Sequence, residues 1–182
     1  MKIINSMRKK TNKLIGLTYL FLLLFTGGSK SIAQPENSAL FIELGGNAGL
    51  WSINYDASLY EFHENAHLQT RIGLGLFSEF KTNQYADVFC PITISALLGN
   101  EEHFVEVGVG QTISNYSHID WNNENGIGRT TEVLTNLNLA YRFQSSQSKL
   151  LLRFAYTPLI ILSSQNRFQH WFGLSLGLQL SN

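Results

Sequence analysis

The chain has too few cysteines for an intrachain disulfide and no basic region suited to nucleic acid. Cys90 is the only cysteine among 182 residues, and only 14% of the residues are charged. Six of the 13 basic residues and none of the 13 acidic ones lie in residues 1–33, which leaves seven bases against 13 acids in the remainder. Stability therefore has to come from packing and hydrogen bonds, and the acidic balance argues against a nucleic-acid partner.

The chain also lacks an apolar run long enough for a transmembrane helix. The longest one, LIGLTYLFLLLF at 14–25, has 12 residues, whereas a spanning helix needs about 20. A basic segment precedes this run, and Ser31 and Ala33 occupy the −3 and −1 positions of a cleavage site. This pattern predicts a secretory signal peptide over residues 1–33, cleaved after Ala33, and a single domain over residues 34–182.

No helical apolar period persists after residue 33, whereas a period of two does. In 172–180, for example, Phe172, Leu174, Leu176, Leu178 and Leu180 alternate with Gly173, Ser175, Gly177 and Gln179. Segments of this kind between turn signals predict eight strands, at about 39–46, 50–60, 67–78, 88–98, 102–115, 130–143, 148–160 and 168–180. The sequence thus predicts an all-β protein, an eight-stranded antiparallel up-and-down transmembrane β-barrel.

The connections support this interpretation because short and long ones alternate. Residues 99–102 and 144–147 are tight turns, whereas residues 79–87, 116–129 and 161–167 are longer and polar, which is typical of an outer-membrane barrel. The weakest boundary is GGNAG at 45–49, where the apolar parity switches. We interpret it as a tight turn; a bulge there would reduce the number of strands to seven.

Alternation alone fits a membrane barrel with its aliphatic face in lipid and a soluble lipocalin-like barrel with that face inside. The polar face is rich in Gly, Ser, Asn and Thr instead of Lys and Glu, which favours the membrane barrel. The charges on strands share the phase of this polar face, so we expect an ion-pair network in the lumen. Its members are Glu43, Asp56, Arg71, Glu106, Arg142 and Arg153, with Glu79 as a further acid.

Aromatic residues lie near the predicted strand ends and suit the girdles at the two membrane interfaces, although ordinary packing is an alternative. They are Tyr55, Tyr60, Phe77, Tyr141, Phe143, Tyr156, Trp171 and Phe172.

The chain resembles the small eight-stranded outer-membrane β-barrel proteins of Gram-negative bacteria. The resemblance rests on the signal peptide, on FIELGGNAGLWSINYD (41–56), on LLGNEEHFVEVGVG (97–110) and on FGLSLGLQL (172–180) as the closing strand. It implies a location in the outer membrane of the cell envelope, contact with lipid and lipopolysaccharide, and insertion by the barrel assembly machinery.

HENAH at 63–67 matches H-E-x-x-H, the zinc motif of metalloproteases. Zinc chemistry requires this motif on a helix, where His63 and His67 face one metal and Glu64 activates water. Here it falls between two predicted strands, in a turn of about six residues, and the third ligand pattern is missing. We therefore predict no metal site and no cofactor.

Other polar residues suggest less. Ser117, His118 and Asp120 are the residue types of a hydrolase triad, and His170 is another possible base, but no oxyanion-hole pattern accompanies them. Cys90, beside Pro91, has no partner base. We predict a non-enzymatic protein with a structural or surface-recognition role, which contacts its partner through the extracellular loop 116–129 and its residues Tyr116, His118, Asp120 and Trp121. The alternatives are a lipid A-modifying acyl hydrolase, a small pore and a soluble lipocalin-like periplasmic binder.

Overall fold

The computed structural model describes residues 38–63, 65–77, 86–119, 127–160 and 168–180. The predicted signal peptide and the residues Glu64, Glu79, Asp120 and Trp121 lie outside the described residues. The strands are β1 (Ser38–Gly45), β2 (Trp51–His63), β3 (Ala66–Phe77), β4 (Asp87–Asn100), β5 (His103–Ile119), β6 (Ile127–Gln144), β7 (Leu150–Tyr156), β8 (Leu159–Ile160), β9 (Phe168–Gln169) and β10 (Phe172–Gln179).

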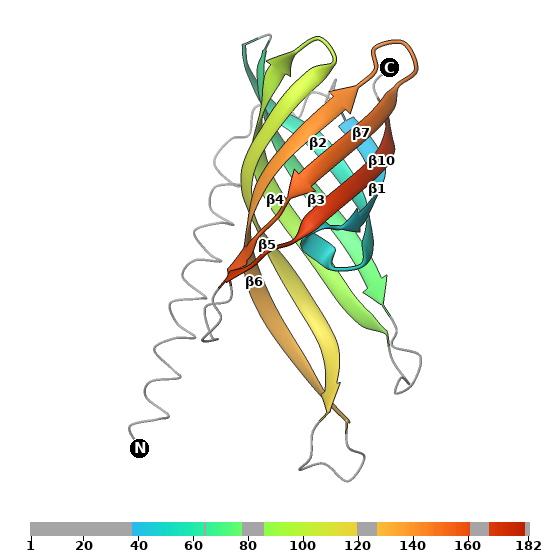
Figure 1. Cartoon of the computed structure of the whole chain (residues 1–182), viewed down its shortest axis with the longest axis vertical. Helices are drawn as coiled ribbons and strands as arrows, with labels where there is room; N and C mark the ends of the chain where they lie inside the picture. Colours follow the sequence, from blue (N-terminus) through green and yellow to red (C-terminus); the bar gives the residue numbers. More distant parts are fainter. Residues whose placement is uncertain (1–37, 64, 78–85, 120–126, 161–167, 181–182) are drawn as a thin grey trace, which may run out of the picture. The chain divides into compact units, whose positions relative to one another are not determined.

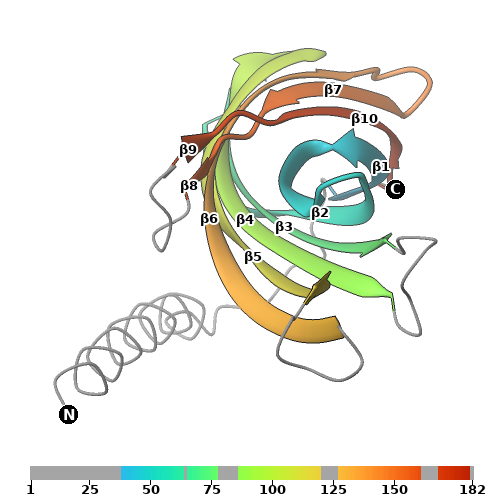
Figure 2. The same cartoon turned by 60° about the horizontal axis from the view of Figure 1, so that its bottom comes forward.

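These strands close into one antiparallel barrel of eight, as the sequence predicts (Figures 1 and 2). Two barrel strands are interrupted, so β7 and β8 form the seventh strand and β9 and β10 form the eighth. The interruption in the seventh strand falls at Thr157 and Pro158, where proline has no N–H to donate. Pairing of β1 with β10 and of β5 with β6 completes the ring.

The aliphatic face of every long strand points outward. Ile42 is 54% exposed and Leu176 is 58% exposed, whereas the inward side chains Arg153 and Glu106 are at most 1% exposed. Strand alternation places all members of one phase on the same face, so the barrel has an apolar exterior and a polar interior. The lipocalin-like alternative requires the opposite arrangement and is wrong for the described barrel.

Several strands are longer than the sequence patterns predict. β5 and β6 pair without interruption from His103 opposite Phe143 to Ile119 opposite Ile127, and this hairpin extends beyond the other strands in Figure 1. Tyr116 and His118 therefore lie in β5 and not in a loop, which corrects the predicted loop 116–129. Backbone pairing continues here through polar residues that carry no apolar alternation.

The GGNAG segment is a turn, as predicted. A short 3-10 helix, η1 (Gly46–Ala48), connects β1 to β2, and Gly45, Gly46 and Gly49 have positive φ angles of 74°, 72° and 85°. All three η1 residues are buried, so this connection packs into the lumen at the end of the barrel opposite the tight turns. In the described part of the chain, no helix is long and apolar enough to span a membrane.

Candidate functional site

The six predicted lumen residues lie together inside the barrel and are joined by ion pairs. Arg71 donates from Nε to Asp56 Oδ1 at 2.7 Å and from Nη2 to Glu106 Oε1 at 3.0 Å. Arg142 donates to Asp56 Oδ2 at 2.6 Å. Three guanidinium groups face three carboxylates, so the network carries no net charge. A buried ion is tolerated only when it is paired in this way.

Arg153 connects the network across the lumen. Its Nη1 donates to Glu43 Oε1 at 2.7 Å, and its Nε donates to Glu106 Oε2 at 2.8 Å. The side chains of Glu43, Glu106 and Arg153 come from β1, β5 and β7, so these ion pairs join strands that are not neighbours in the ring. The network therefore closes the centre of the lumen and ties opposite walls together.

Two neutral side chains complete the network, and neither was expected as a member. Gln69 accepts a hydrogen bond from Arg142 Nη1 at 3.0 Å, and Asn138 bonds both Glu106 and Arg153. Both residues have the inward phase: Gln69 lies two positions from Arg71 in β3, and Asn138 lies four positions from Arg142 in β6. Their inward position in the strand alternation could have identified Gln69 and Asn138 as members, but the network was predicted from charged residues alone.

A layer of neutral polar residues surrounds the buried turn η1. Asn47 Nδ2 donates to Thr93 Oγ1 at 3.3 Å, and Thr112 Oγ1 donates to the Asn47 carbonyl at 2.8 Å. Asn136 in turn donates to Thr112 Oγ1 at 3.2 Å. These bonds fix the turn directly to β4 and β5, and Asn136 extends the polar layer to β6.

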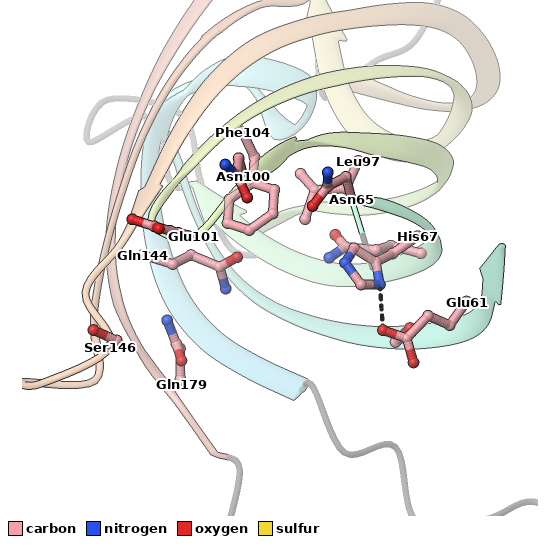
Figure 3. Close-up of a pocket in the computed structure, with 12 residues that line it drawn as sticks. Glu61, Asn65, His67, Leu97, Asn100, Glu101, Phe104, Gln144, Ser146 and Gln179 are labelled. Carbon is pink, nitrogen blue, oxygen red and sulfur yellow. Dashed lines mark ion pairs between the residues drawn. The ribbon is translucent and has the colours of Figure 1, made fainter. Parts of the chain in front are cut away.

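The opposite end of the barrel holds a polar pocket of about 400 Å³. It is lined by Ser58, Glu61, Asn65, His67, Gln69, Leu97, Asn100, Glu101, Phe104, Gln144, Ser146 and Gln179. Asn65, Glu101 and Ser146 belong to the tight turns between successive strands, which places the pocket at the short-turn mouth. Figure 3 shows Glu61 and His67 side by side, with 3.2 Å between the carboxylate Oε1 and the ring Nδ1.

One rim of this mouth is held by a contact between two turns. Glu102 accepts hydrogen bonds from the backbone N–H of Ser146 at 2.7 Å and from its hydroxyl at 2.8 Å. These two bonds hold the pKa of the Glu102 carboxyl below its usual value, and the bond from the backbone N–H has the larger effect. The β4–β5 turn is thereby fastened to the β6–β7 turn.

The far end of the β5–β6 hairpin is polar. The backbone N–H of Ser117 donates to Asp87 Oδ1 at 2.7 Å, and Arg129 donates to the carbonyl of Ala86 at 3.0 Å. Partial burial, and then the Glu132 carboxylate, raise the pKa of the Tyr116 phenol above its ordinary value. Of the four residues predicted for the extracellular loop, Tyr116 and His118 are described, and both lie on this hairpin.

The HENAH motif lies in a β-hairpin and not on a helix. β2 continues to His63 and β3 begins at Ala66, so the turn is shorter than the six residues predicted. His63 is exposed, whereas His67 lines the pocket and pairs with Glu61. No group of three or more metal-ligating side chains occurs in the described part of the chain.

The candidate bases contact neutral hydroxyl groups. His118 Nδ1 lies 3.3 Å from Thr130 Oγ1, and His170 Nδ1 lies 2.6 Å from Tyr156 Oη. Cys90 is a free cysteine of intermediate exposure, opposite Ile113 in the β4–β5 ladder. The described contacts of these three residues do not assemble a nucleophile with a base.

Aromatic side chains gather on the outer surface near both ends of the barrel. At the short-turn end, Tyr60 lies against Phe62, and His103 lies against Tyr141 and Phe143. At the other end, the rings in contact are Tyr156, Phe168, His170 and Phe172. Phe154 stacks on Phe172 but is the cross-strand partner of Tyr141, so it lies between the two groups. Tyr55 differs from the prediction: it lies within the aliphatic belt, opposite Leu40 and Ile72.

Comparison with solved structures assigns the fold. The chain is similar to the N-terminal β-barrel domain of OprF from Pseudomonas aeruginosa, with 12% identity and a TM-score of 0.52 over 78% of this chain and 97% of that one. It is also similar to Ail, the attachment invasion locus protein of Yersinia pestis, with 11% identity and a TM-score of 0.53 over 79% of this chain and 98% of that one. No protein-family model and no curated protein matches the sequence. The fold is that of the small eight-stranded outer-membrane barrels, which confirms the resemblance.

Proposed function

We propose that the protein is an integral outer-membrane β-barrel with a structural or surface-recognition role and no enzymatic activity. The observation that carries this proposal is the outward aliphatic belt around a buried, charge-balanced interior. An apolar exterior of this extent is stable in hydrocarbon and aggregates in water. The two aromatic bands fit the interfaces on either side of the bilayer.

The alternation of connections sets the orientation. Outer-membrane barrels have short turns on the periplasmic side and longer loops on the cell surface. The tight turns at Asn65, at residues 101–102 and at residues 145–149 then face the periplasm, and the β5–β6 hairpin projects from the cell. We propose that this hairpin, with Tyr116 and His118, is the recognition surface.

Gel mobility with and without boiling tests the membrane barrel. The outer-membrane fraction is extracted in detergent, and a band that migrates differently before boiling is the expected result for a folded barrel that resists SDS. A protein that is recovered from the periplasmic extract without a heat shift would contradict the proposal.

Deletion of residues 117–127 separates recognition from folding. Every barrel strand keeps both neighbouring strands after this deletion, so we expect the shortened protein to fold and to keep its heat shift. Cells that carry the shortened protein should lose attachment to the surface that cells with the full chain bind. A shortened protein without a heat shift would show that the hairpin end belongs to the core. Unchanged attachment would contradict recognition through this hairpin.

The small-pore alternative predicts steady conductance in planar bilayers. The paired arginines and carboxylates fill the lumen together with buried Phe41, Leu97 and Leu151, so we propose a closed barrel and expect no steady single-channel steps.

The acyl hydrolase alternative predicts release of acyl chains from lipid A that His118→Ala or His170→Ala abolishes.

A further inference from the structure

The pocket at the short-turn mouth has the chemistry of a ligand site. Its volume of about 400 Å³ falls within the range of about 300–1,000 Å³ that is typical of small-molecule sites. Gln69 and Leu97, at its deep end, are only 4% and 2% exposed, and Gln69 is held in place by Arg142. The site is therefore backed by the rigid charge network.

The lining residues exclude two classes of ligand. Only Leu97 and Phe104 among the twelve lining side chains are apolar, which disfavours a fatty acyl chain. None of the twelve is lysine or arginine, whereas Glu61 and Glu101 supply carboxylates. The basic side chain among the twelve is His67, which already lies 3.2 Å from the Glu61 carboxylate. A phosphate or carboxylate ligand at His67 would therefore meet Glu61 beside it, so anions are disfavoured as well.

The remaining side chains match a polyhydroxylated amine. Amide groups both donate and accept hydrogen bonds, as sugar hydroxyls do, and the pocket offers the amides of Asn65, Gln69, Asn100, Gln144 and Gln179. A carboxylate gives an ammonium group a charge-assisted bond. The Phe104 ring, with the His67 ring edge-on to it, supplies an aromatic surface against which a sugar ring can pack.

We propose that this pocket binds a small amino sugar, with its ammonium group at Glu61 and its hydroxyls on the amides. This proposal rests on the proposed function in one respect: the orientation proposed above makes the pocket face the periplasm. The pocket lies at the end opposite the recognition hairpin, so it is a second site and not part of the first.

Titration of the purified, detergent-solubilised protein tests the ligand class. Glucosamine is the probe, and backbone amide resonances of the lining residues are followed by NMR. We expect saturable shifts confined to the short-turn mouth. Glucose, which has a hydroxyl in place of the ammonium group, should bind about tenfold more weakly because one charge-assisted bond is lost. Glucosamine 6-phosphate should bind more weakly than glucosamine.

Three variants locate the site. Glu61→Gln should weaken glucosamine binding about tenfold and leave glucose binding unchanged. Ser58→Trp fills the cavity and should abolish saturable shifts for both sugars. Glu132→Gln, a carboxylate change at the other end of the barrel, is the matched control and should bind like the unmodified chain.

Non-saturating shifts, equal affinity for glucose and glucosamine, or undiminished binding by Ser58→Trp would each overturn the amino-sugar site. Each variant is first checked for its heat shift on gels, so loss of binding is separated from loss of folding. A protein that keeps its heat shift but fails to bind glucosamine leaves the outer-membrane proposal standing and removes only this one.

Discussion

Arg153 joins side chains from three other strands of the barrel. It contacts Glu43 on β1, Glu106 on β5 and Asn138 on β6. Glu106 keeps Arg71 as a second partner, whereas among the described residues the cation paired with Glu43 is Arg153 alone. Replacing Arg153 therefore leaves Glu43 with the distant hydroxyl of Ser175, 3.5 Å away.

Arg153→Met should lower the free energy of unfolding by about 3–5 kcal/mol, the usual cost of leaving a buried charge without its partner. Adding Glu43→Gln removes that charge and should recover a large part of the loss. The measurement is a double-mutant cycle of urea unfolding in detergent, followed by tryptophan fluorescence. A coupling energy near zero between positions 43 and 153 would contradict the ion pair as a stabilising contact.

At the scale of elements, the β1–β2 turn shows how closely the backbone approaches the network. A Cβ on Gly46 would lie 2.4 Å from the Glu43 carboxyl carbon, whereas a Cβ on Gly49 would meet nothing within 4 Å. Both glycines have positive φ, so both substitutions strain the backbone. Only the substitution of Gly46 also disturbs the buried Glu43 carboxylate.

Gly49→Ala should cost about 1–2 kcal/mol of unfolding free energy, from the left-handed backbone alone. Gly46→Ala should cost more, because the new methyl group also displaces Glu43 from Arg153. Urea unfolding of the two variants, side by side, gives the difference. Equal losses would show that the turn can move away from the carboxylate at no cost.

The contact between turns predicts a dependence on pH. The pKa of Glu102 is lowered in the folded protein by its bonds to Ser146, so its stabilising contribution is present above the unfolded value of 4.5 and is lost as the pH falls through the lower folded value. We expect the stability difference between the unmodified chain and Glu102→Gln to shrink between pH 6 and pH 3.

The adjacent Glu101→Gln, which leaves both bonds to Ser146 intact, is the control for Glu102→Gln. Its stability difference from the unmodified chain should change less over the same range. A pH dependence that is identical in the two variants would contradict the assignment of this effect to the Glu102 contact.

The strands could be predicted from the sequence where apolar and polar side chains alternate. They could not be predicted where backbone pairing continues a strand through residues without that alternation. Alternation at 172–180 fixed the phase of β10, and the same rule placed Arg71, Arg142 and Arg153 on the inward face. The hairpin beyond Ser114 is polar on both faces, so its pairing left no periodic signal. The pocket likewise gathers residues from three hairpins and the last strand, and only closure of the barrel shows that they meet.

At the scale of the whole molecule, the arrangement of charge and apolar surface is inverted relative to a soluble protein. Ions and amides occupy the interior, while exposed leucines, isoleucines and valines form the wall. Such a wall is favourable only if hydrocarbon replaces water around it. The depth of a residue along a strand then determines the cost of placing a charge there.

Leu176 and Leu180 offer a test of this environment, because they share the outward face of one barrel strand. Leu176 lies mid-belt, opposite Ile42 and Leu152, whereas Leu180 follows the last residue of β10. In lipid bilayers, Leu176→Arg should cost about 2–4 kcal/mol of unfolding free energy and Leu180→Arg about 0–1 kcal/mol. Urea unfolding in liposomes measures both. If water instead surrounded the barrel, an arginine at position 176 would leave stability unchanged and raise solubility, and the membrane assignment would fail.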